Sequence, residues 1–441
     1  MSALTIGFLS FPVLILLIFI RIPIGAAMLF VGLVGNFLVR GTFLPVLSQM
    51  KDLPFSTFSS YSLSIVPLFL LMGQLATLGG MSAALFKTAQ IWLGHKRGGV
   101  AMAAIGACAG FGAICGSSLA TAATMGQVAL PELKKHGYSD ALATGALAAG
   151  GTLGILIPPS IILVILAILT EQNIAKLFLA ALVPGLIAMF GYMLAVSLYV
   201  RFNPESATRT APRQPLSARL KSLADIWPVL LVFTVVIGGI YAGIFTPTEG
   251  AAIGAFGTGL IAWFSGGLNR HTALGAITAT ASSTAMIFFI ILGAAVFNSF
   301  LALTQVPQFA AQFITEQGFN PWLILGVILL AYVVFGTLMD SLSMILLTIP
   351  IFYPIVVMLD FGLSPVEFGL WFAVLVLVVV EVGLITPPVG LNLFVINKMS
   401  PGTSLLETYR GVLAFILSDF VRIVLLVTFP FLSLFLVRLV F

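Results

Sequence analysis

Charged residues are scarce in this sequence. Only 7% of its 441 residues are Asp, Glu, Lys or Arg, while 60% are apolar, and the mean hydropathy is +1.18. A water-soluble protein of this length needs a polar surface that so few charged side chains cannot supply. Apolar stretches of about 20 residues, enough to cross a bilayer core ~30 Å thick, recur along the chain. The sequence therefore predicts an all-α integral membrane protein with several crossings.

Cysteine and histidine are scarce as well. Cys108 and Cys115 lie in one apolar segment, a pattern that predicts neither a disulfide framework nor a metal site. His95, His136 and His271 lie in loops, and the sequence contains no HExxH or Gly-x-Ser-x-Gly motif. These absences argue against an intramembrane enzyme, so we predict no catalytic residue. The net charge of +5 does not indicate a nucleic-acid partner, because basic residues in such proteins usually mark cytoplasmic loops.

The apolar segments form two series of equal length and order, separated by one long polar segment. The first series consists of 5–20, 22–39, 62–86, a broken pair 99–131, 141–170 and 174–200. The second consists of 226–245, 248–266, 279–303, a broken pair 321–358, 366–397 and 411–440. The first segment lacks a basic flank and a clear cleavage site, so we expect a membrane span there and not a removed signal peptide.

Local similarity supports an internal repeat. GILIPPS (154–160) resembles GLITPPV (383–389), and the segment around Pro23 resembles that around Pro247. These matches, like that between HGYS and FGLS, all lie about 225 residues apart. We therefore predict two homologous halves, 1–200 and 226–441, joined by the linker 201–225.

The distribution of basic residues predicts the orientation. If each half crosses five times and its broken pair is a re-entrant hairpin, most of the 19 Lys and Arg residues collect on one face, including those of the linker. By the positive-inside rule that face is cytoplasmic, both termini are periplasmic, and the halves are inverted repeats. The hairpin 99–131 then enters from the cytoplasmic side and 321–358 from the periplasmic side. Hairpins that crossed as ordinary helix pairs would weaken this segregation.

Two proline pairs, Pro158-Pro159 and Pro387-Pro388, interrupt otherwise apolar helices at matching positions. Inverted repeats with interrupted helices are typical of secondary transporters. A break frees backbone carbonyls that can coordinate Na⁺, and the following half-helix presents its positive end to an anion. The alternative is that each proline pair simply kinks its helix. The repetition of the pair at matching positions of both halves disfavours this alternative.

The hairpins carry polar groups that fit this interpretation. Ser117 and Ser118 follow Gly116 in the first hairpin, and Asp340 is the single acid of the second. An ionisable group at membrane depth marks a functional site by default, here as a cation ligand or proton carrier. Glu381 precedes the second proline pair and could reach the same site or pair with the backbone. Glu249 begins a helix, where an acid usually has a structural role.

At this level of detail the sequence resembles a known family. GSSLATAATMG (116–126), ALPELKKHGYSDALATGALAAGGTLGILIPPS (129–160), IFTPTEGAA (244–252) and LITPPVGLNLFVI (384–396) resemble the large membrane subunit, M or DctM type, of TRAP transporters. The resemblance covers essentially the whole chain. It implies Na⁺-driven uptake, with about two or more Na⁺ per substrate, of an organic anion such as a dicarboxylate, sialic acid or another sugar acid. It also implies an elevator-type mechanism in the bacterial inner membrane, a separate small four-helix Q-type subunit, and a periplasmic P-type binding protein.

The resemblance also implies roles for individual residues. One Na⁺ site would join Ser117 and Ser118 to backbone around Gly154, Ile157 and Pro158. A second would join Asp340 and Ser341 to backbone around Gly383 and Thr386, with Glu381 as a further ion-coupling acid. The expected substrate contacts are Thr121, Pro159, Ser160, Pro388 and Asn392. The alternative is a stand-alone ion-coupled anion carrier of related architecture, which needs no binding protein.

Overall fold

The computed structural model describes residues 2–441, without the side chain of Thr315. Within this range it is helical, with one isolated bridge between Tyr138 and Ala207 as the only strand-like pairing. The first ten α-helices are α1 (Ala3–Phe19), α2 (Ile24–Arg40), α3 (Leu44–Phe58), α4 (Ile65–Leu78), α5 (Met81–Leu93), α6 (Gly99–Cys115), α7 (Ser118–Lys135), α8 (Asp140–Leu156), α9 (Ile161–Leu169) and α10 (Ile174–Phe202). The others are α11 (Leu216–Asp225), α12 (Trp227–Phe233), α13 (Gly239–Tyr241), α14 (Pro247–Phe264), α15 (Arg270–Thr304), α16 (Val306–Glu316), α17 (Pro321–Gly336), α18 (Ser341–Val357), α19 (Pro365–Ile385), α20 (Leu391–Lys398), α21 (Leu405–Thr428) and α22 (Phe431–Val440).

Several helices are suited to a bilayer. Five of those described are long and apolar enough to cross it, or up to seven if each of two bent pairs counts as one span. One of the bent pairs is α8 with α9, which meet at 48° across the first proline pair. Large apolar side chains such as Phe190 and Leu194 are exposed on the helix surfaces, as contact with lipid requires. The all-helical, multi-pass class is therefore confirmed, while five crossings per half stays a prediction.

The structure divides some predicted segments. Within the segment 62–86, α4 ends before Gly79 and α5 begins after Gly80. Gly80 adopts a φ of 71°, a conformation that favours glycine. The segment 411–440 is divided at Phe429-Pro430 into α21 and α22. The polar linker 201–225 ends in α11, and α3 and α16 are further helices that the hydropathy pattern did not predict. Their polar residues lower the local hydropathy without preventing helix formation.

The described chain forms two compact units, each drawn from both sequence halves. Unit 1 comprises Met1–Ser64, Ala281–Ala331 and Leu342–Gly369. Unit 2 comprises Ile65–Thr280, Tyr332–Ser341 and Leu370–Phe441. The two predicted halves are defined by a repeat in the sequence, whereas the two units are defined by contacts. The division into homologous halves therefore stays a prediction.

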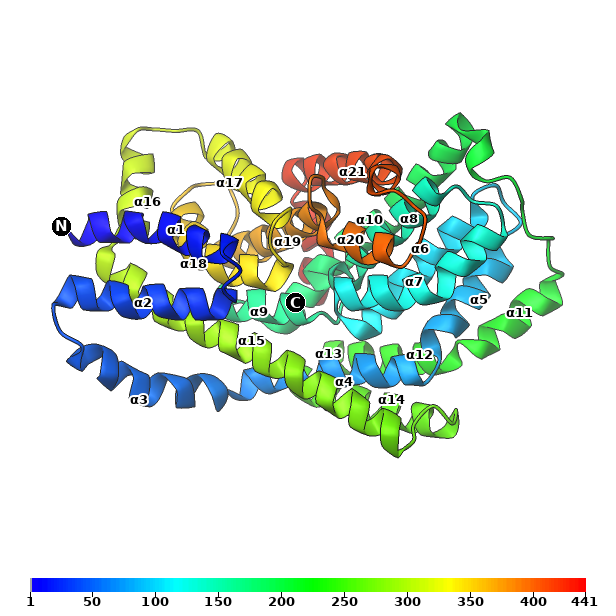
Figure 1. The fold of residues 1–441 in the computed structure, drawn as a ribbon, viewed down its shortest axis with the longest axis horizontal. Coiled ribbons are helices and arrows are strands. Elements are labelled where there is room, and N and C mark those ends of the chain that lie inside the picture. The colour runs from blue at the N-terminus through cyan, green and yellow to red at the C-terminus, as the bar shows by residue number, and fades with distance from the viewer. Residues whose placement is uncertain (1) are drawn as a thin grey trace. The chain divides into compact units, whose positions relative to one another are not determined.

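Small residues set the helix packing in unit 1. Helices α1 and α2 run side by side (Figure 1), and glycines of α2 face α15. A Cβ atom on Gly25 would lie 3.0 Å from the Cα of Ile290, and one on Gly32 would lie 2.9 Å from the backbone N of Phe297. Glycine at these positions allows the two backbones to approach closely, as is common between membrane helices.

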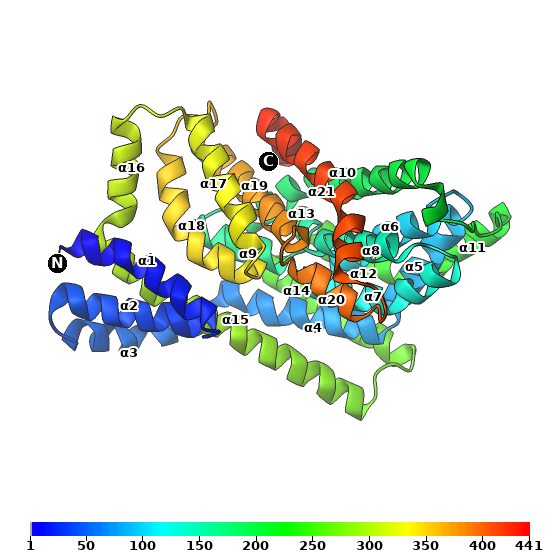
Figure 2. The same ribbon diagram turned by 45° about the horizontal axis from the view of Figure 1, so that its top comes forward.

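Helix α8 lies at the centre of unit 2. It contacts α6, α7, α10, α20 and α21, which surround it in both ribbon views (Figures 1 and 2). Every residue of α8 from Leu142 to Leu156 is buried. The strongly apolar helix α19 is buried from Phe368 to its end at Ile385. Its Trp371 donates a hydrogen bond to the Leu426 carbonyl at 2.8 Å. Helices buried on all sides explain why neither shows an amphipathic pattern.

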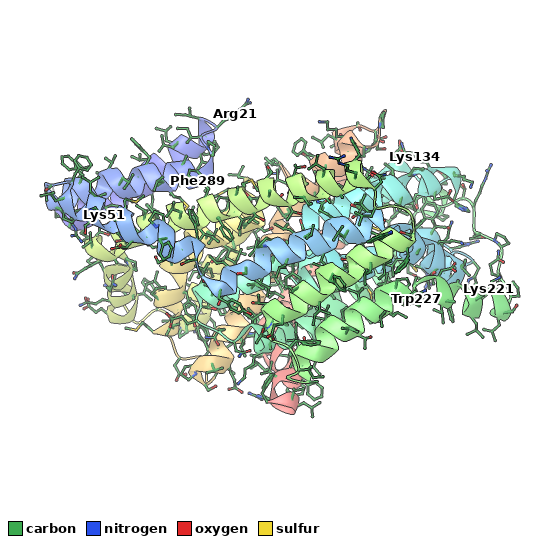
Figure 3. The ribbon with its side chains drawn as sticks, turned by 90° about the horizontal axis from the view of Figure 1, so that it is seen from below. Arg21, Lys51, Lys134, Lys221, Trp227 and Phe289 are labelled. Atoms are coloured by element: carbon green, nitrogen blue, oxygen red, sulfur yellow. The ribbon has the colours of Figure 1, made fainter. Side chains whose placement is uncertain are left out.

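The end of the linker packs on α5. Thr88 donates a hydrogen bond to the Ser222 carbonyl at 2.9 Å, and Lys87 forms an ion pair with Asp225 at 3.4 Å. Lys221 stands at the edge of the unit, while Trp227 begins α12 (Figure 3). The second half of the linker is thus an ordered helix attached to the first half of the chain.

Candidate functional site

The first hairpin turns at Gly116-Ser117. Helix α6 ends at Cys115, and Gly116 adopts the left-handed conformation with φ 64°. Ser117 is extended and caps α7, its hydroxyl accepting a hydrogen bond from the Ala120 N–H at 3.4 Å. Glycine followed by serine is the local chemistry that ends one helix and starts another. The side chain of Ser118 is consequently left to point to a partner outside its own hairpin.

The first broken helix passes directly beside this tip. Residues 157–160 separate α8 from α9, with a cis peptide bond between Pro158 and Pro159. A Cβ atom on Gly116 would lie 3.2 Å from the Pro159 carbonyl oxygen. One turn away, Gly112 of α6 packs backbone to backbone on Gly154 of α8. The first hairpin and the first break therefore form one contact region.

The second hairpin and the second break meet in the same way. Residues 386–390 separate α19 from α20, again with a cis peptide bond between the two prolines. The Gly390 N–H donates a hydrogen bond to the Thr337 carbonyl at 3.2 Å. A Cβ atom on Gly383 would lie 2.6 Å from the backbone of Gly336. A glycine of the hairpin thus packs on a glycine of the broken helix in both halves.

Glu381 connects the two hairpins. Its side chain is 0% exposed. The Ser341 hydroxyl donates a hydrogen bond to its Oε1 at 2.7 Å, and the Ser118 hydroxyl donates another to its Oε2. The family resemblance implies separate Na⁺ sites for the two serines, yet both donate to the one carboxylate of Glu381. Asp340, next to Ser341, is only partly buried.

Three expected substrate contacts are fully buried beside α8. Thr121 places its hydroxyl against Gly154. Asn392 donates a hydrogen bond from Nδ2 to the Ala148 carbonyl at 3.2 Å, while its Oδ1 has no hydrogen-bond partner among the described residues. Ser160 caps α9 by accepting a hydrogen bond from the Leu163 N–H at 3.4 Å.

The other expected ligands have mixed surroundings. Thr386, directly after α19, donates its hydroxyl proton to the Val382 carbonyl in the last turn of that helix at 2.6 Å. The Pro388 carbonyl accepts a hydrogen bond from the Tyr409 hydroxyl. The carbonyls of Ile157 and Pro158 lie within the unwound stretch. Among the residues that the structure describes, no three His, Cys, Asp or Glu side chains cluster. Any cation here would be held mainly by hydroxyl, carbonyl and single carboxylate oxygens, which suit a hard cation.

A second buried polar cluster, which we did not predict from the sequence, lies between α8, α10 and α21. Asp419 and Arg422 of α21 are 1% and 2% exposed and form an ion pair at 2.7 Å. Tyr192 donates a hydrogen bond to Asp419 Oδ2 at 2.8 Å, and its hydroxyl lies 3.1 Å from that of Thr152 on α8. The i, i+3 spacing of Asp419 and Arg422 was the available signal.

Glu249 has the structural role that we favoured. Thr246 and Glu249 form a reciprocal capping box at the start of α14, and the carboxylate accepts hydrogen bonds from the Thr246 N–H and hydroxyl at 2.8 and 2.9 Å. This geometry satisfies the first free N–H groups of the helix.

Comparison with known proteins adds independent information. The family described as "Tripartite ATP-independent periplasmic transporter, DctM component" matches residues 11–432. The chain is 38% identical over 387 residues to a C4-dicarboxylate TRAP transporter large permease protein of Pseudomonas aeruginosa, covering 86% of this chain and 87% of that protein. It is 31% identical over 420 residues to a sialic acid TRAP transporter large permease protein of Vibrio cholerae, covering 94% of each.

A solved structure is similar in fold. The YdaH transporter of Alcanivorax borkumensis aligns with a TM-score of 0.63 over 88% of this chain and 89% of that chain, at 15% sequence identity. Identity this low supports a shared fold only.

Proposed function

Because the chain belongs to the DctM component family of tripartite ATP-independent periplasmic transporters, we propose that it is the large permease subunit of a Na⁺-coupled importer of an organic anion. The observation that carries the proposal is the meeting of two hairpin tips and two broken helices, with Glu381 hydrogen-bonded to one serine from each tip. A permease moves its substrate without covalent chemistry, so the chain is not an enzyme.

The substrate that fits is a carboxylate. The two relatives are named for C4-dicarboxylates and for sialic acid, which share this group. The buried Arg422 is already paired with Asp419, so a substrate anion would be held by hydroxyl and amide groups. The N–H groups at the starts of α9 and α20, together with Thr121, Ser160 and Asn392, supply these, and a helix N-terminus favours negative charge. Pro159 and Pro388 shape the two unwound stretches around them.

Cation coupling follows from charge. A buried carboxylate at Glu381 repels an incoming anion unless a cation compensates it. The proposed first Na⁺ site uses Ser117 and Ser118 with backbone from Gly154 to Pro158. The second uses Asp340 and Ser341 with backbone around Gly383 and Thr386. Two or more Na⁺ ions per substrate would neutralise the site and order both tips before the anion binds.

An inverted repeat and an elevator-type movement complete the proposal. The packing of a hairpin glycine on a broken-helix glycine occurs in both halves, at Gly112 with Gly154 and at Gly336 with Gly383. Such repetition supports two related halves. Both breaks and both tips belong to unit 2, so a movement of this unit as a body would carry the whole site.

The membrane context is also part of the proposal. The term tripartite in the family description supports a small four-helix membrane subunit and a periplasmic binding protein as partners. We place the chain in the bacterial inner membrane with both termini periplasmic and residues 201–225 cytoplasmic. The alternative, a stand-alone ion-coupled carrier, differs in needing no binding protein.

Reconstitution tests this function. The chain, its small subunit and its binding protein are placed in proteoliposomes, and uptake of labelled C4-dicarboxylate and sialic acid is measured under an inward Na⁺ gradient. We expect uptake of a carboxylate that requires Na⁺ and binding protein, with more than one Na⁺ per substrate. Asp340→Ala should abolish Na⁺-dependent uptake while the protein stays folded. Uptake that follows a proton gradient without Na⁺ would contradict the coupling, and uptake without binding protein would favour the alternative.

A further inference from the structure

Helix α11 of unit 2 exposes a row of leucines. Leu216, Leu220 and Leu223 recur at positions i, i+4 and i+7, so they lie along one face of the helix. Their exposed fractions are 65%, 56% and 38%. The face that packs on α5 is a different one, because it holds the buried Ser222. The leucine row is therefore available for contact with an apolar phase outside the protein.

Helix α11 meets the apolar segment that follows it at an angle. The helix pair Leu216–Asp225 and Trp227–Tyr241 is bent by 52°, and Trp227 at the bend is 57% exposed. Trp is enriched where an apolar membrane segment reaches the headgroup region. An amphipathic helix that leaves such a segment at an angle is suited to lying along the membrane surface, with its apolar row towards the acyl chains.

Basic side chains gather around this helix. The linker is attached to the loop between α5 and α6, where the Ala211 N–H donates a hydrogen bond to the Gly94 carbonyl at 3.0 Å and Arg219 Nη2 lies 3.3 Å from His95 Nδ1. These contacts bring the basic residues of the loop and of the linker to one end of unit 2. The basic patch consists of Lys96, Arg97, Arg209, Arg213, Arg219 and Lys221.

Most acidic side chains at this end of the unit have basic partners outside the patch. The ion pairs are Lys87 with Asp225, Lys134 with Asp140, and Lys135 with Glu132. Within the linker 201–225, Glu205 is the one other acid. The patch therefore carries an excess of positive charge beside the leucine row, with Lys221 at the edge of the unit (Figure 3).

We propose that α11 is an interfacial membrane helix whose leucine row inserts into the adjacent lipid leaflet, while the basic patch binds the phosphate groups of anionic phospholipids. Each Lys or Arg close to the membrane surface strengthens binding to anionic lipid about fivefold. Zwitterionic lipid supplies only the apolar contact. Because α11 is anchored on α5, anionic lipid bound here stabilises unit 2. This inference is independent of Na⁺ coupling and of the substrate carried.

The first test locates the leucine row. Leu220→Cys and Lys221→Cys are neighbours in sequence that differ in helix face, and the native cysteines are buried, so a bimane label attaches selectively. The full-length protein is placed in lipid nanodiscs, where both faces of the bilayer are accessible. We expect phospholipids with brominated acyl chains to quench the label at 220, and aqueous iodide to quench the label at 221. A label at 220 that iodide quenches, or that neither agent reaches, overturns the insertion.

The second test measures preference for anionic lipid. The Tm of the detergent-solubilised full-length protein is followed against added phosphatidylglycerol or phosphatidylcholine. We expect phosphatidylglycerol to raise the Tm at lower concentration. In the variant Arg213→Gln, Lys221→Gln, which alters two exposed side chains, the half-saturating phosphatidylglycerol concentration should rise about fivefold or more. The Tm in phosphatidylcholine should stay as in the wild-type protein.

The matched control removes two exposed charges elsewhere. Arg40→Gln, Lys51→Gln alters two exposed basic residues of unit 1 and should keep the wild-type response to phosphatidylglycerol. Equal responses to the two lipids, or equal shifts in the variant and the control, overturn the assignment of the basic patch. These results leave the proposed transport function intact, because neither test measures uptake or Na⁺ dependence.

Discussion

At the scale of single residues, the buried charged side chains of unit 2 have two kinds of partner. Asp419 and Arg422 lie three residues apart on α21 and form an ion pair. Tyr192 donates a further hydrogen bond to the Asp419 carboxylate. Glu381 is instead surrounded by hydroxyl donors from two hairpins. A buried pair compensates its own charges, whereas a single buried carboxylate needs a bound cation or a proton. A buried carboxylate thus stabilises helix packing at Asp419, whereas in our proposal the carboxylate of Glu381 takes part in ion coupling.

The ion pair gives a prediction at this scale. Asp419→Asn preserves the side-chain volume but leaves the Arg422 guanidinium buried without a counter-charge. Breaking a buried pair in this way costs about 3–5 kcal/mol, so we expect a clear fall in the Tm of the purified protein. The double variant Asp419→Asn, Arg422→Met removes both charges and should recover much of the loss. A single variant as stable as wild type would contradict this assignment.

At the scale of helices, glycine contacts decide how the hairpins meet the broken helices. Gly112 lies on the face of α6 that touches Gly154, and this contact sets the height of the first tip relative to the first break. Gly110, two residues earlier, faces the flexible side chain of Leu85, whose Cδ2 would lie 3.2 Å from an added Cβ. Gly110 and Gly112 therefore differ in whether their surroundings can accommodate an added methyl group.

A matched pair of alanine substitutions tests this difference. Gly112→Ala adds a methyl group that would overlap the backbone of Gly154, and a backbone cannot rotate away. We expect it to lower stability by about 1–3 kcal/mol and to weaken uptake, because the tip is displaced from the break. Gly110→Ala should be nearly neutral, since the Leu85 side chain can move. Equal effects of the two substitutions would show that the backbone contact does not position the tip.

At the scale of the whole molecule, the two compact units each combine segments from both halves of the chain. The site itself takes its residues from the first hairpin, the second hairpin and the second broken helix, all within unit 2. An inverted repeat would explain why each half supplies equivalent parts to one site.

The proposed orientation in the membrane can be tested by labelling from one side. Single cysteines placed at Ser2 and Arg213 are treated with a membrane-impermeant thiol reagent from outside spheroplasts. We expect labelling at position 2 and none at 213 until the membrane is opened, since the basic linker should remain cytoplasmic. The native Cys108 and Cys115 are buried, so background labelling should be low. The reverse pattern would contradict both the orientation and the inverted repeat.

Features set by local chemistry can be recognised from the sequence. The membrane class follows from composition, because too few charged groups are available to cover a water-soluble surface. The breaks at Pro158-Pro159 and Pro387-Pro388 follow from missing N–H donors, and the turn at Gly116 follows from a conformation that favours glycine. Each of these depends on neighbouring residues only, so it can be recognised without knowing the fold.

Contacts between residues far apart in the sequence are set by helix packing and cannot be recognised from the sequence. Ser118 and Glu381 are 263 residues apart in sequence, and Tyr192 and Asp419 are 227 apart. Their contacts depend on the register with which α8 packs against its neighbours, and that register is set by backbone approaches such as Gly112 on Gly154. No local pattern carries this information, because glycine and serine are common throughout membrane helices. The sequence therefore identified the polar groups of the site, and helix packing determined that two of them share one carboxylate.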